Sequence, residues 1–170
     1  MKFCPTLMLM TFLAAFLSSA NAEPLNVGDK APQVGGTTDA GAALNLGDLY
    51  KQNAYTLVWF YPRALTGGCT RQGCSLRDAS AELTRHGVAV VGVSNDPVAK
   101  QKEFKEVNNF PFPLLADTER QVIRAFGQTG SGAAKREAYL IKKGRIVYKD
   151  AGVTDKQAEN ILNYLATQGG

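Results

Sequence analysis

Two compact apolar runs constrain the fold of this 170-residue chain more than any other feature. Residues 55–60 read YTLVWF, and residues 88–93 read VAVVGV. Continuous apolar runs of this length predict strands that are buried on both faces. Because a segment with apolar residues at helical spacing lies between them, the two runs predict a strand–helix–strand unit in an α/β fold.

The rest of the chain continues this alternation of helix and strand signals. In chain order we expect a loose or hairpin-like start at residues 23–46, a helix from about Gly67 to His86, a helix begun by Asp96-Pro97 and ending near Val107, a short strand at 112–115, a helix capped by Asp117 and ending near Phe126, a hairpin of 137–141 with 145–148, and a last helix capped by Thr154. The pattern predicts a single α/β domain over residues 23–170. Its mixed central sheet should carry helices on both faces.

Residues 1–22 have the features of an export signal. Lys2 precedes an apolar run from Leu7 to Leu17, and Ala20-Asn21-Ala22 matches the small-residue pattern of a cleavage site. The apolar run is short for a membrane span. We therefore expect cleavage after Ala22 and an exported protein of the bacterial periplasm that keeps no membrane attachment.

The charge pattern argues against a nucleic-acid partner. The formal net charge is +4 at pH 7 and becomes +3 when Lys2 is removed. Acidic and basic residues are interspersed, as in KQKEFKE at residues 100–106, and no basic stripe with interleaved aromatic residues is present. Such a distribution is typical of a solvated surface.

Two cysteines remain after the predicted cleavage, Cys69 and Cys74. Cys69 follows a Thr-Gly-Gly turn and falls in the first turn of the predicted helix, where the helix N-terminus favours a thiolate. Cys74 lies five residues later and could receive an oxidation product of Cys69. A purely structural disulfide is the alternative interpretation. It would add little stability, because so short a loop restricts the unfolded chain very little.

Thiolate formation alone cannot make a good catalyst. A free thiol is about 3% ionised at pH 7, so full ionisation gains roughly thirtyfold in rate, whereas enzymes accelerate reactions at least about a millionfold. Neighbouring groups must orient the substrate and stabilise charge. Thr66 offers a hydroxyl that donates and accepts, Pro62 can shield the site, and an arginine would supply a permanent cation.

The cysteine segment resembles a known family. The PxxxTxxC pattern of residues 62–69 is similar to the active-site signature of the peroxiredoxins, and CTxQxCxLRD at residues 69–78 resembles their Q subfamily, the bacterioferritin comigratory protein type. The resemblance extends from about Val27 to the C-terminus. It implies a thioredoxin-like fold and an antioxidant thiol peroxidase, an oxidoreductase that reduces hydrogen peroxide and organic hydroperoxides.

The resemblance also implies roles for individual residues. Cys69 would be the peroxidatic cysteine and Cys74 the resolving one, with a redox-active Cys69–Cys74 disulfide between them. Thr66 and Pro62 match the threonine and proline of the signature. Arg136, next to a predicted strand, matches the distant active-site arginine. No metal, haem or flavin is implied, and a thioredoxin-like protein or another dithiol would re-reduce the disulfide.

The spacing of the two cysteines predicts a conformational change. In a regular helix, residues five apart have Cα atoms roughly 8.6 Å apart. A disulfide needs less than about 7 Å. We therefore expect Cys69 to become a sulfenic acid first, and the first turns of the helix to unwind before Cys74 attacks. Because both thiols lie in one chain, catalysis needs no dimer, and we expect a monomer.

Other interpretations of the sequence stay open. Arg63 or Arg71 could supply the cation in place of Arg136, and Thr66 could be no more than a helix cap. A copper-binding or copper-delivery module on the same fold would use both cysteines and a distant histidine, but the only histidine is His86, twelve residues after Cys74. A thiol–disulfide exchange protein would favour a C-x-x-C pair, which the sequence lacks.

Overall fold

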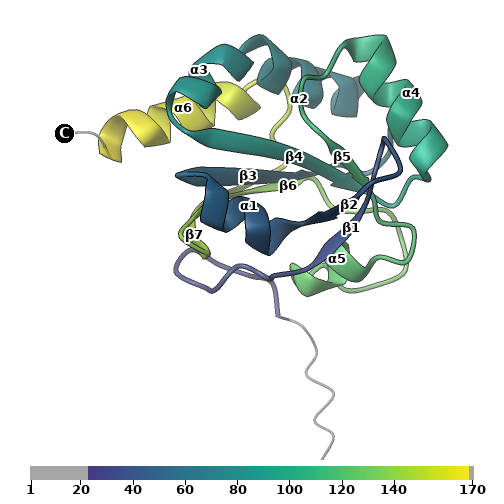
Figure 1. Ribbon diagram of the computed structural model, residues 1–170, viewed down its shortest axis with the longest axis horizontal. Helices are drawn as coiled ribbons and strands as arrows, with labels where there is room; N and C mark the ends of the chain where they lie inside the picture. Colours follow the sequence, from purple (N-terminus) through teal and green to yellow (C-terminus); the bar gives the residue numbers. More distant parts are fainter. Residues whose placement is uncertain (1–22, 169–170) are drawn as a thin grey trace, which may run out of the picture.

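The computed structural model describes residues 23–168 (Figure 1). Residues 1–22, where the export signal is predicted, lie outside the described residues, as do residues 169–170. The strands are β1 (Gly35–Thr38), β2 (Ala43–Asn45), β3 (Tyr55–Phe60), β4 (Val88–Ser94), β5 (Leu114–Ala116), β6 (Glu137–Lys142) and β7 (Arg145–Ala151). The helices are α1 (Leu46–Gln52), α2 (Gly67–Asp78), α3 (Ser80–Arg85), α4 (Val98–Asn108), α5 (Gln121–Ala125) and α6 (Gln157–Gln168).

The strands form a mixed sheet, as the sequence predicts. Within the described residues the sheet has seven strands in the order β2-β1-β5-β4-β3-β6-β7. Strands β3, β4 and β5 run parallel to one another, and the β6–β7 hairpin adds antiparallel to β3. The two apolar runs of the sequence are therefore the adjacent central strands β3 and β4.

Both faces of the sheet are covered by helices. Helices α2, α3, α4 and α6 lie on one face, and α1 and α5 on the other (Figure 1). Leu57 and Trp59 of β3 pack in the first of these layers, whereas Val58 and Phe60 pack in the second. Because successive strand residues point to opposite faces, a strand buried on both sides must be apolar at nearly every position. This is why β3 reads as a continuous apolar run.

The long helix predicted from Gly67 to His86 is two helices. Helix α2 ends at Asp78, Ala79 takes φ −95° and ψ 6°, and α3 begins at Ser80. Ala79 donates its N–H to the Ser75 and Arg77 carbonyls and so closes the last turn of α2. The break lets α2 pack against α6 while α3 packs against β4. Tertiary packing overrides the helix propensity of alanine here.

Two of the predicted helix caps are also wrong, because neither Asp117 nor Thr154 directly precedes its helix. Helix α5 begins at Gln121, and Asp117 lies before it, although its carboxylate accepts the Ile123 N–H at 2.7 Å. Helix α6 begins at Gln157, and the Thr154 hydroxyl contacts Asp155. Among residues 23–168, no helix combines the length and apolarity needed to cross a bilayer.

Candidate active site

Cys69 lies near the start of α2, just beyond the carboxyl end of β3, and its side chain is 1% exposed. The carboxyl ends of parallel strands are where α/β sheets usually hold their sites. The first backbone hydrogen bond of α2 runs from the Thr70 N–H to the Thr66 carbonyl at 2.8 Å. The N–H groups of residues 67–69 therefore have no hydrogen-bond partner within the helix. They lie in the same first turn of α2 as the Cys69 side chain. A helix start of this kind favours an anion.

The loop that leads into α2 is held by Asp96. The Asp96 carboxylate accepts the Ala64 N–H at 2.7 Å and the Ser94 hydroxyl at 2.8 Å. Asp96 was predicted to cap the following helix, but α4 begins at Val98 with no side-chain cap. The prediction is wrong because the carboxylate faces the loop after β3, which lies next to the end of β4 in the sheet.

A buried pair of polar side chains, Tyr61 and Gln101, links the end of β3 to α4. Tyr61 directly follows β3, is completely buried, and donates its hydroxyl to Gln101 of α4. Gln101 in turn donates to the Ser94 hydroxyl at 2.8 Å and to the Leu115 carbonyl at 2.9 Å. Burial raises the pKa of Tyr61 well above its ordinary value, although the hydrogen bond to Gln101 opposes part of that rise. The phenol therefore stays protonated and serves as a donor.

Thr66 occupies the N-cap position of α2, but its side chain does not cap the helix. Its hydroxyl donates to the Arg63 carbonyl at 2.9 Å. The lone pairs of the hydroxyl oxygen thus stay available to accept a further hydrogen bond. The side chain of Thr66 is exposed and Pro62 is half-buried, so both lie where a small molecule could reach them.

Arg136 reaches Cys69 from the opposite end of the sequence. Its Nη2 donates to the Cys69 Sγ at 3.4 Å. The register of the sheet explains the approach, because Glu137 pairs with Phe60 and places residue 136 beside the carboxyl end of β3. The neighbouring Lys135 is exposed and gives its N–H to the buried Gln128 at 2.7 Å. The structure therefore brings Arg136, and not Lys135, to the thiol.

Two residues of α2 shape the position of the guanidinium. Gln72 is completely buried, and its Oε1 accepts from Arg136 Nη1 at 2.6 Å. At Gly68, a Cβ would stand 3.1 Å from Arg136 Nη2, so only glycine leaves the guanidinium its full space. Sequence reasoning matched Gln72 to a motif without giving it a role. Its spacing of three from Cys69, which puts both on one face of a helix, was the available signal.

Cys74 lies on the same helix but away from Cys69. It is half-buried, its Sγ is 3.9 Å from Asn108 Oδ1, and both cysteines are free thiols. Helix α2 is continuous across both positions. Since a regular helix keeps residues five apart beyond disulfide reach, the two thiols cannot bond in this conformation.

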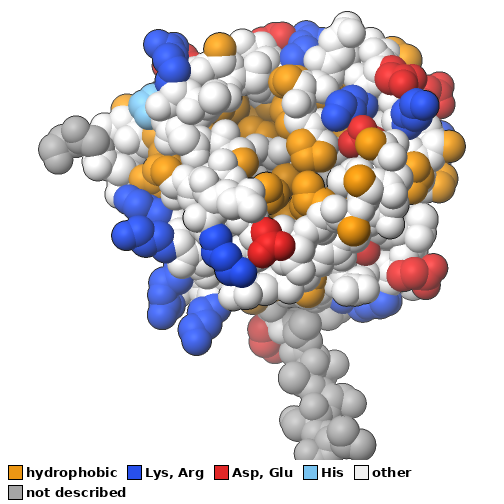
Figure 2. All heavy atoms as spheres, in the orientation of Figure 1, with side chains coloured by type: hydrophobic (Ala, Val, Ile, Leu, Met, Phe, Trp, Pro, Cys, Tyr) orange, Lys and Arg blue, Asp and Glu red, His pale blue; other side chains and the backbone are white. Residues whose placement is uncertain are grey.

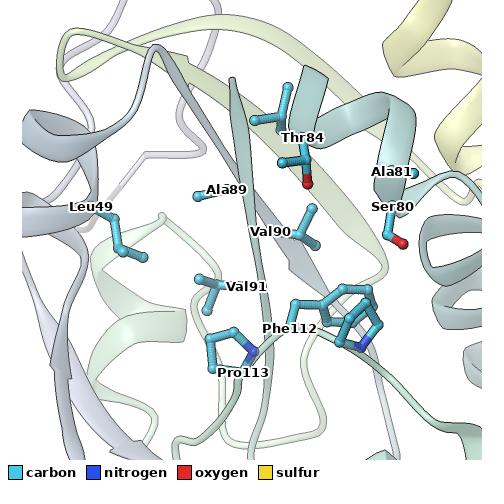
Figure 3. Close-up of a pocket in the computed structure, with 11 residues that line it drawn as sticks. Leu49, Ser80, Ala81, Thr84, Ala89, Val90, Val91, Phe112 and Pro113 are labelled. Atoms are coloured by element: carbon cyan, nitrogen blue, oxygen red, sulfur yellow. The ribbon is translucent and has the colours of Figure 1, made fainter. Parts of the chain in front are cut away.

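An apolar groove of the described residues lies away from this site. Hydrophobic side chains gather in a depression at the centre of the face in Figure 2. Figure 3 shows the groove, about 590 Å³ in volume, along residues 88–91 of β4, with Leu49 on one side and Phe112 and Pro113 at one end. Strand β5 pairs only with residues 92–94 of β4, which leaves this stretch uncovered. Neither Cys69 nor Arg136 lines it.

His86 is remote from a possible metal centre with the cysteines. It forms the C-cap of α3, after the break in the helix. Within residues 23–168, no group of three or more His, Cys, Asp or Glu side chains is placed to hold a metal ion.

Comparisons with known proteins agree on one family. The profile described as AhpC/TSA family matches residues 27–149. Peroxiredoxin Bcp of Escherichia coli is 40% identical over 116 residues, which cover 68% of this chain and 73% of that protein. Peroxiredoxin Bcp of Bacillus subtilis is 32% identical over 146 residues, covering 79% and 92%. The crystal structure of peroxidoxin BcpB from Mycobacterium tuberculosis is similar with a TM-score of 0.78 and 28% identity, covering 85% of this chain and 98% of that one, and this likeness confirms the expected thioredoxin-like fold.

Proposed function

The chain belongs to the AhpC/TSA family and is a peroxiredoxin of the Bcp, or Q, type, a thiol-dependent peroxidase; from this premise we propose that Cys69 is its peroxidatic cysteine. The substrates are hydrogen peroxide and organic hydroperoxides. One observation carries the assignment: the buried Sγ of Cys69 accepts a hydrogen bond from Arg136 Nη2 at 3.4 Å, at a helix N-terminus. A permanent cation and unpaired backbone N–H groups both favour the thiolate.

In the first step, the Cys69 thiolate attacks one oxygen of the peroxide. The S–O bond forms as the O–O bond breaks, and the leaving alkoxide or hydroxide takes a proton from solvent water to become alcohol or water. Sulfur is oxidised to the sulfenic acid and the peroxide is reduced by two electrons. Arg136 and the N–H groups of residues 67–69 can donate to the oxygens on which charge develops. The Thr66 hydroxyl oxygen can accept a hydrogen bond from the O–H of the peroxide and so orient the substrate.

In the second step, Cys74 resolves the sulfenic acid. Its thiol attacks the Cys69 sulfur, the disulfide forms and water leaves. The first turns of α2 must unwind for this, because the helix holds the two thiols apart. An external dithiol, of which a thioredoxin-like protein is our proposed example, then returns two electrons and two protons by thiol–disulfide exchange.

Single-turnover and steady-state peroxide consumption with a dithiol donor test the two assignments. Cys69→Ser should abolish consumption, because the nucleophile is lost. Cys74→Ser should consume one equivalent and then stop, with a sulfenic acid that a dimedone probe traps. Sustained turnover in Cys69→Ser would overturn the peroxidatic assignment, and normal turnover in Cys74→Ser would overturn the resolving one.

Amide hydrogen exchange tests the unwinding separately. We expect residues 67–75 to lose protection when the disulfide forms, because the helical hydrogen bonds of α2 break. Cys74→Ser treated with peroxide provides the control, since it carries the sulfenic acid without the disulfide. Equal protection in the reduced and disulfide forms would contradict the unwinding step.

We further propose that the protein acts as an exported, periplasmic monomer. The support is the N-terminal pattern of Lys2, the apolar run and Ala20-Asn21-Ala22. Expression of the full chain in a Gram-negative host, followed by cell fractionation and mass determination, should find a periplasmic protein that begins at Glu23. A full-length protein in the cytoplasmic fraction would refute export. Light scattering should give the mass of one chain.

A further inference from the structure

A chain of hydrogen bonds leads from Arg136 through two buried glutamines to Asp150 of β7. Arg136 Nη1 donates to Gln72 Oε1 at 2.6 Å, and Gln72 Nε2 donates to Gln157 Oε1 at 2.9 Å. Gln157 Nε2 then donates to Asp150 Oδ2 at 2.8 Å. Both glutamines are completely buried. We call these four side chains the amide relay.

The two ends of the relay fix the direction of every bond in it. A guanidinium has donors only, and a carboxylate has acceptors only. Between such ends, two amides have a single consistent orientation, in which each carbonyl faces Arg136 and each NH₂ faces Asp150. If Gln72 turned over, its NH₂ would face the donors of Arg136. Arg136 thus fixes which group of Gln72 meets the guanidinium, and the carboxylate of Asp150 anchors the same orientation from the other end.

Asp150 is held in place at a cost in stability. Burial raises its pKa, and the Gln157 amide opposes that rise. Its Oδ2 also accepts from the Tyr148 hydroxyl at 3.3 Å, while Oδ1 is buried without a hydrogen-bond partner among the described residues. A carboxylate that gives up hydration without full replacement destabilises the fold. A role other than stability would explain its position.

The two ends of the amide relay, Arg136 and Asp150, both lie at the β6–β7 hairpin. Asp150 on β7 pairs with Ala138 on β6, two residues after Arg136. The Gly152 N–H donates to the Arg136 carbonyl at 2.9 Å, which fixes the backbone of the arginine to β7. Gln157 comes from the first turn of α6 and Gln72 from α2. The backbone and the side chain of Arg136 are thus both anchored. Its Nη2, which takes no part in the relay, donates to Cys69.

We propose that Asp150 and Gln157 are positioning residues of the peroxidase site, which aim Arg136 at Cys69 by anchoring the Gln72 amide in place. The inference rests on the proposed role of Cys69. Neither residue touches the thiol, and both act through Gln72. Hydrogen bonds aligned in one direction polarise one another, so the relay also strengthens the Gln72–Arg136 bond.

The experiment measures the second-order rate constant for oxidation of Cys69 by hydrogen peroxide in a single turnover. Asp150→Asn keeps the shape of the side chain but removes its charge, so the anchor at the end of the relay weakens to a neutral hydrogen bond. The rate constant should fall about tenfold, because a charged hydrogen bond in the relay is replaced by a weaker neutral one. Tyr148→Phe is the matched control: it removes a bond to the same Oδ2 outside the relay, and the rate constant should stay within about twofold of the wild type.

A double variant tests the role of the carboxylate itself. In Asp150→Asn with Gln157→Glu, the carboxylate is at position 157, where it is bonded directly to Gln72. The glutamate can accept from both Gln72 and the asparagine, so a charged group again anchors the Gln72 amide. The rate constant should recover to within about threefold of the wild type. Loss of structure alone would not produce such recovery, and thermal unfolding of each variant checks that the fold is intact.

Each result has one meaning. An unchanged rate constant in Asp150→Asn, or no recovery in a folded double variant, would overturn the positioning role while the proposed function stands. A wild-type rate constant no higher than that of free cysteine would instead overturn the proposed function of Cys69. A loss in the single variant with recovery in the double variant supports the relay.

Discussion

Replacement of Gly68 by alanine should slow the peroxidase reaction without unfolding the protein. A Cβ at this position would stand 3.1 Å from Arg136 Nη2, whereas ordinary contacts begin at 3.4 Å. The same Nη2 donates to the Cys69 Sγ at 3.4 Å. Since the crowded atom is the far end of a long side chain, the arginine can move aside at little cost in stability. Its hydrogen bond to the sulfur is what the movement disturbs.

The size of the effect follows from the distances. The guanidinium must give way by about 0.3–0.6 Å to reach ordinary contact, while Nη1 stays held by Gln72 at 2.6 Å. A hydrogen bond to a charged group is worth about 1.5–3 kcal/mol. Loss of roughly half of it costs about 0.8–1.5 kcal/mol, the upper part of which corresponds to about tenfold in rate.

Gly67→Ala is the matched control for this experiment. A Cβ at Gly67 meets nothing closer than Arg71 Nη1 at 3.7 Å, and the backbone N–H is retained. Stopped-flow oxidation by hydrogen peroxide should show the Gly68 variant about tenfold slower and the Gly67 variant within about twofold of the wild type. If the two variants oxidise at the same rate, the contact of Arg136 with Cys69 does not limit the reaction, and the reasoning fails.

Three further predictions concern the support of the site and the core. Asp96→Ala leaves the Ala64 N–H without its 2.7 Å partner, and urea unfolding should show a loss of about 1–3 kcal/mol; an unchanged midpoint would mean that water replaces the carboxylate. Gly92→Ala places a Cβ 2.5 Å from Leu114 Cδ2 and 3.0 Å from the Trp59 ring, which should cost about 1–3 kcal/mol by overpacking, and thermal unfolding measures it. Burial raises the pKa of Asp150, so the folded protein binds this proton more readily than the unfolded chain does, and ionised Asp150 costs stability at neutral pH. Asp150→Asn should therefore be more stable than the wild type at pH 7, and the difference should shrink as the pH falls through the raised pKa; a difference independent of pH would contradict this.

Local sequence patterns predicted the elements whose form depends on few distant contacts. Strand β3 was predicted from its apolar run, and the β6–β7 hairpin was predicted as residues 137–141 with 145–148, because strand burial and turn chemistry depend on neighbouring residues. The break at Ala79 was not predicted. Alanine favours a helix, and only the packing of α2 on α6 and of α3 on β4 ends the helix there.

The same distinction holds for the polar residues. Asp96-Pro97 reads locally as a helix start, but the Asp96 carboxylate has a partner in Ala64, 32 residues earlier. Helix α1, at Leu46–Gln52, was not predicted either. A polar side chain satisfies whichever donor the fold brings near, and a local pattern cannot reveal a donor from a distant segment.

The sequence by itself determined the chemistry: a cysteine in the first turn of a helix after a Thr-Gly-Gly turn, a second thiol out of reach of the first in a regular helix, and a motif that is similar to one family. These follow from helix geometry and from neighbouring residues alone. The tertiary structure decided which cation meets Cys69. Arg136 lies 67 residues away in the chain and reaches the thiol because β6 pairs with β3, and its side chain is held by α2, α6 and β7 together, since a long flexible arginine keeps one position only when distant elements fix it.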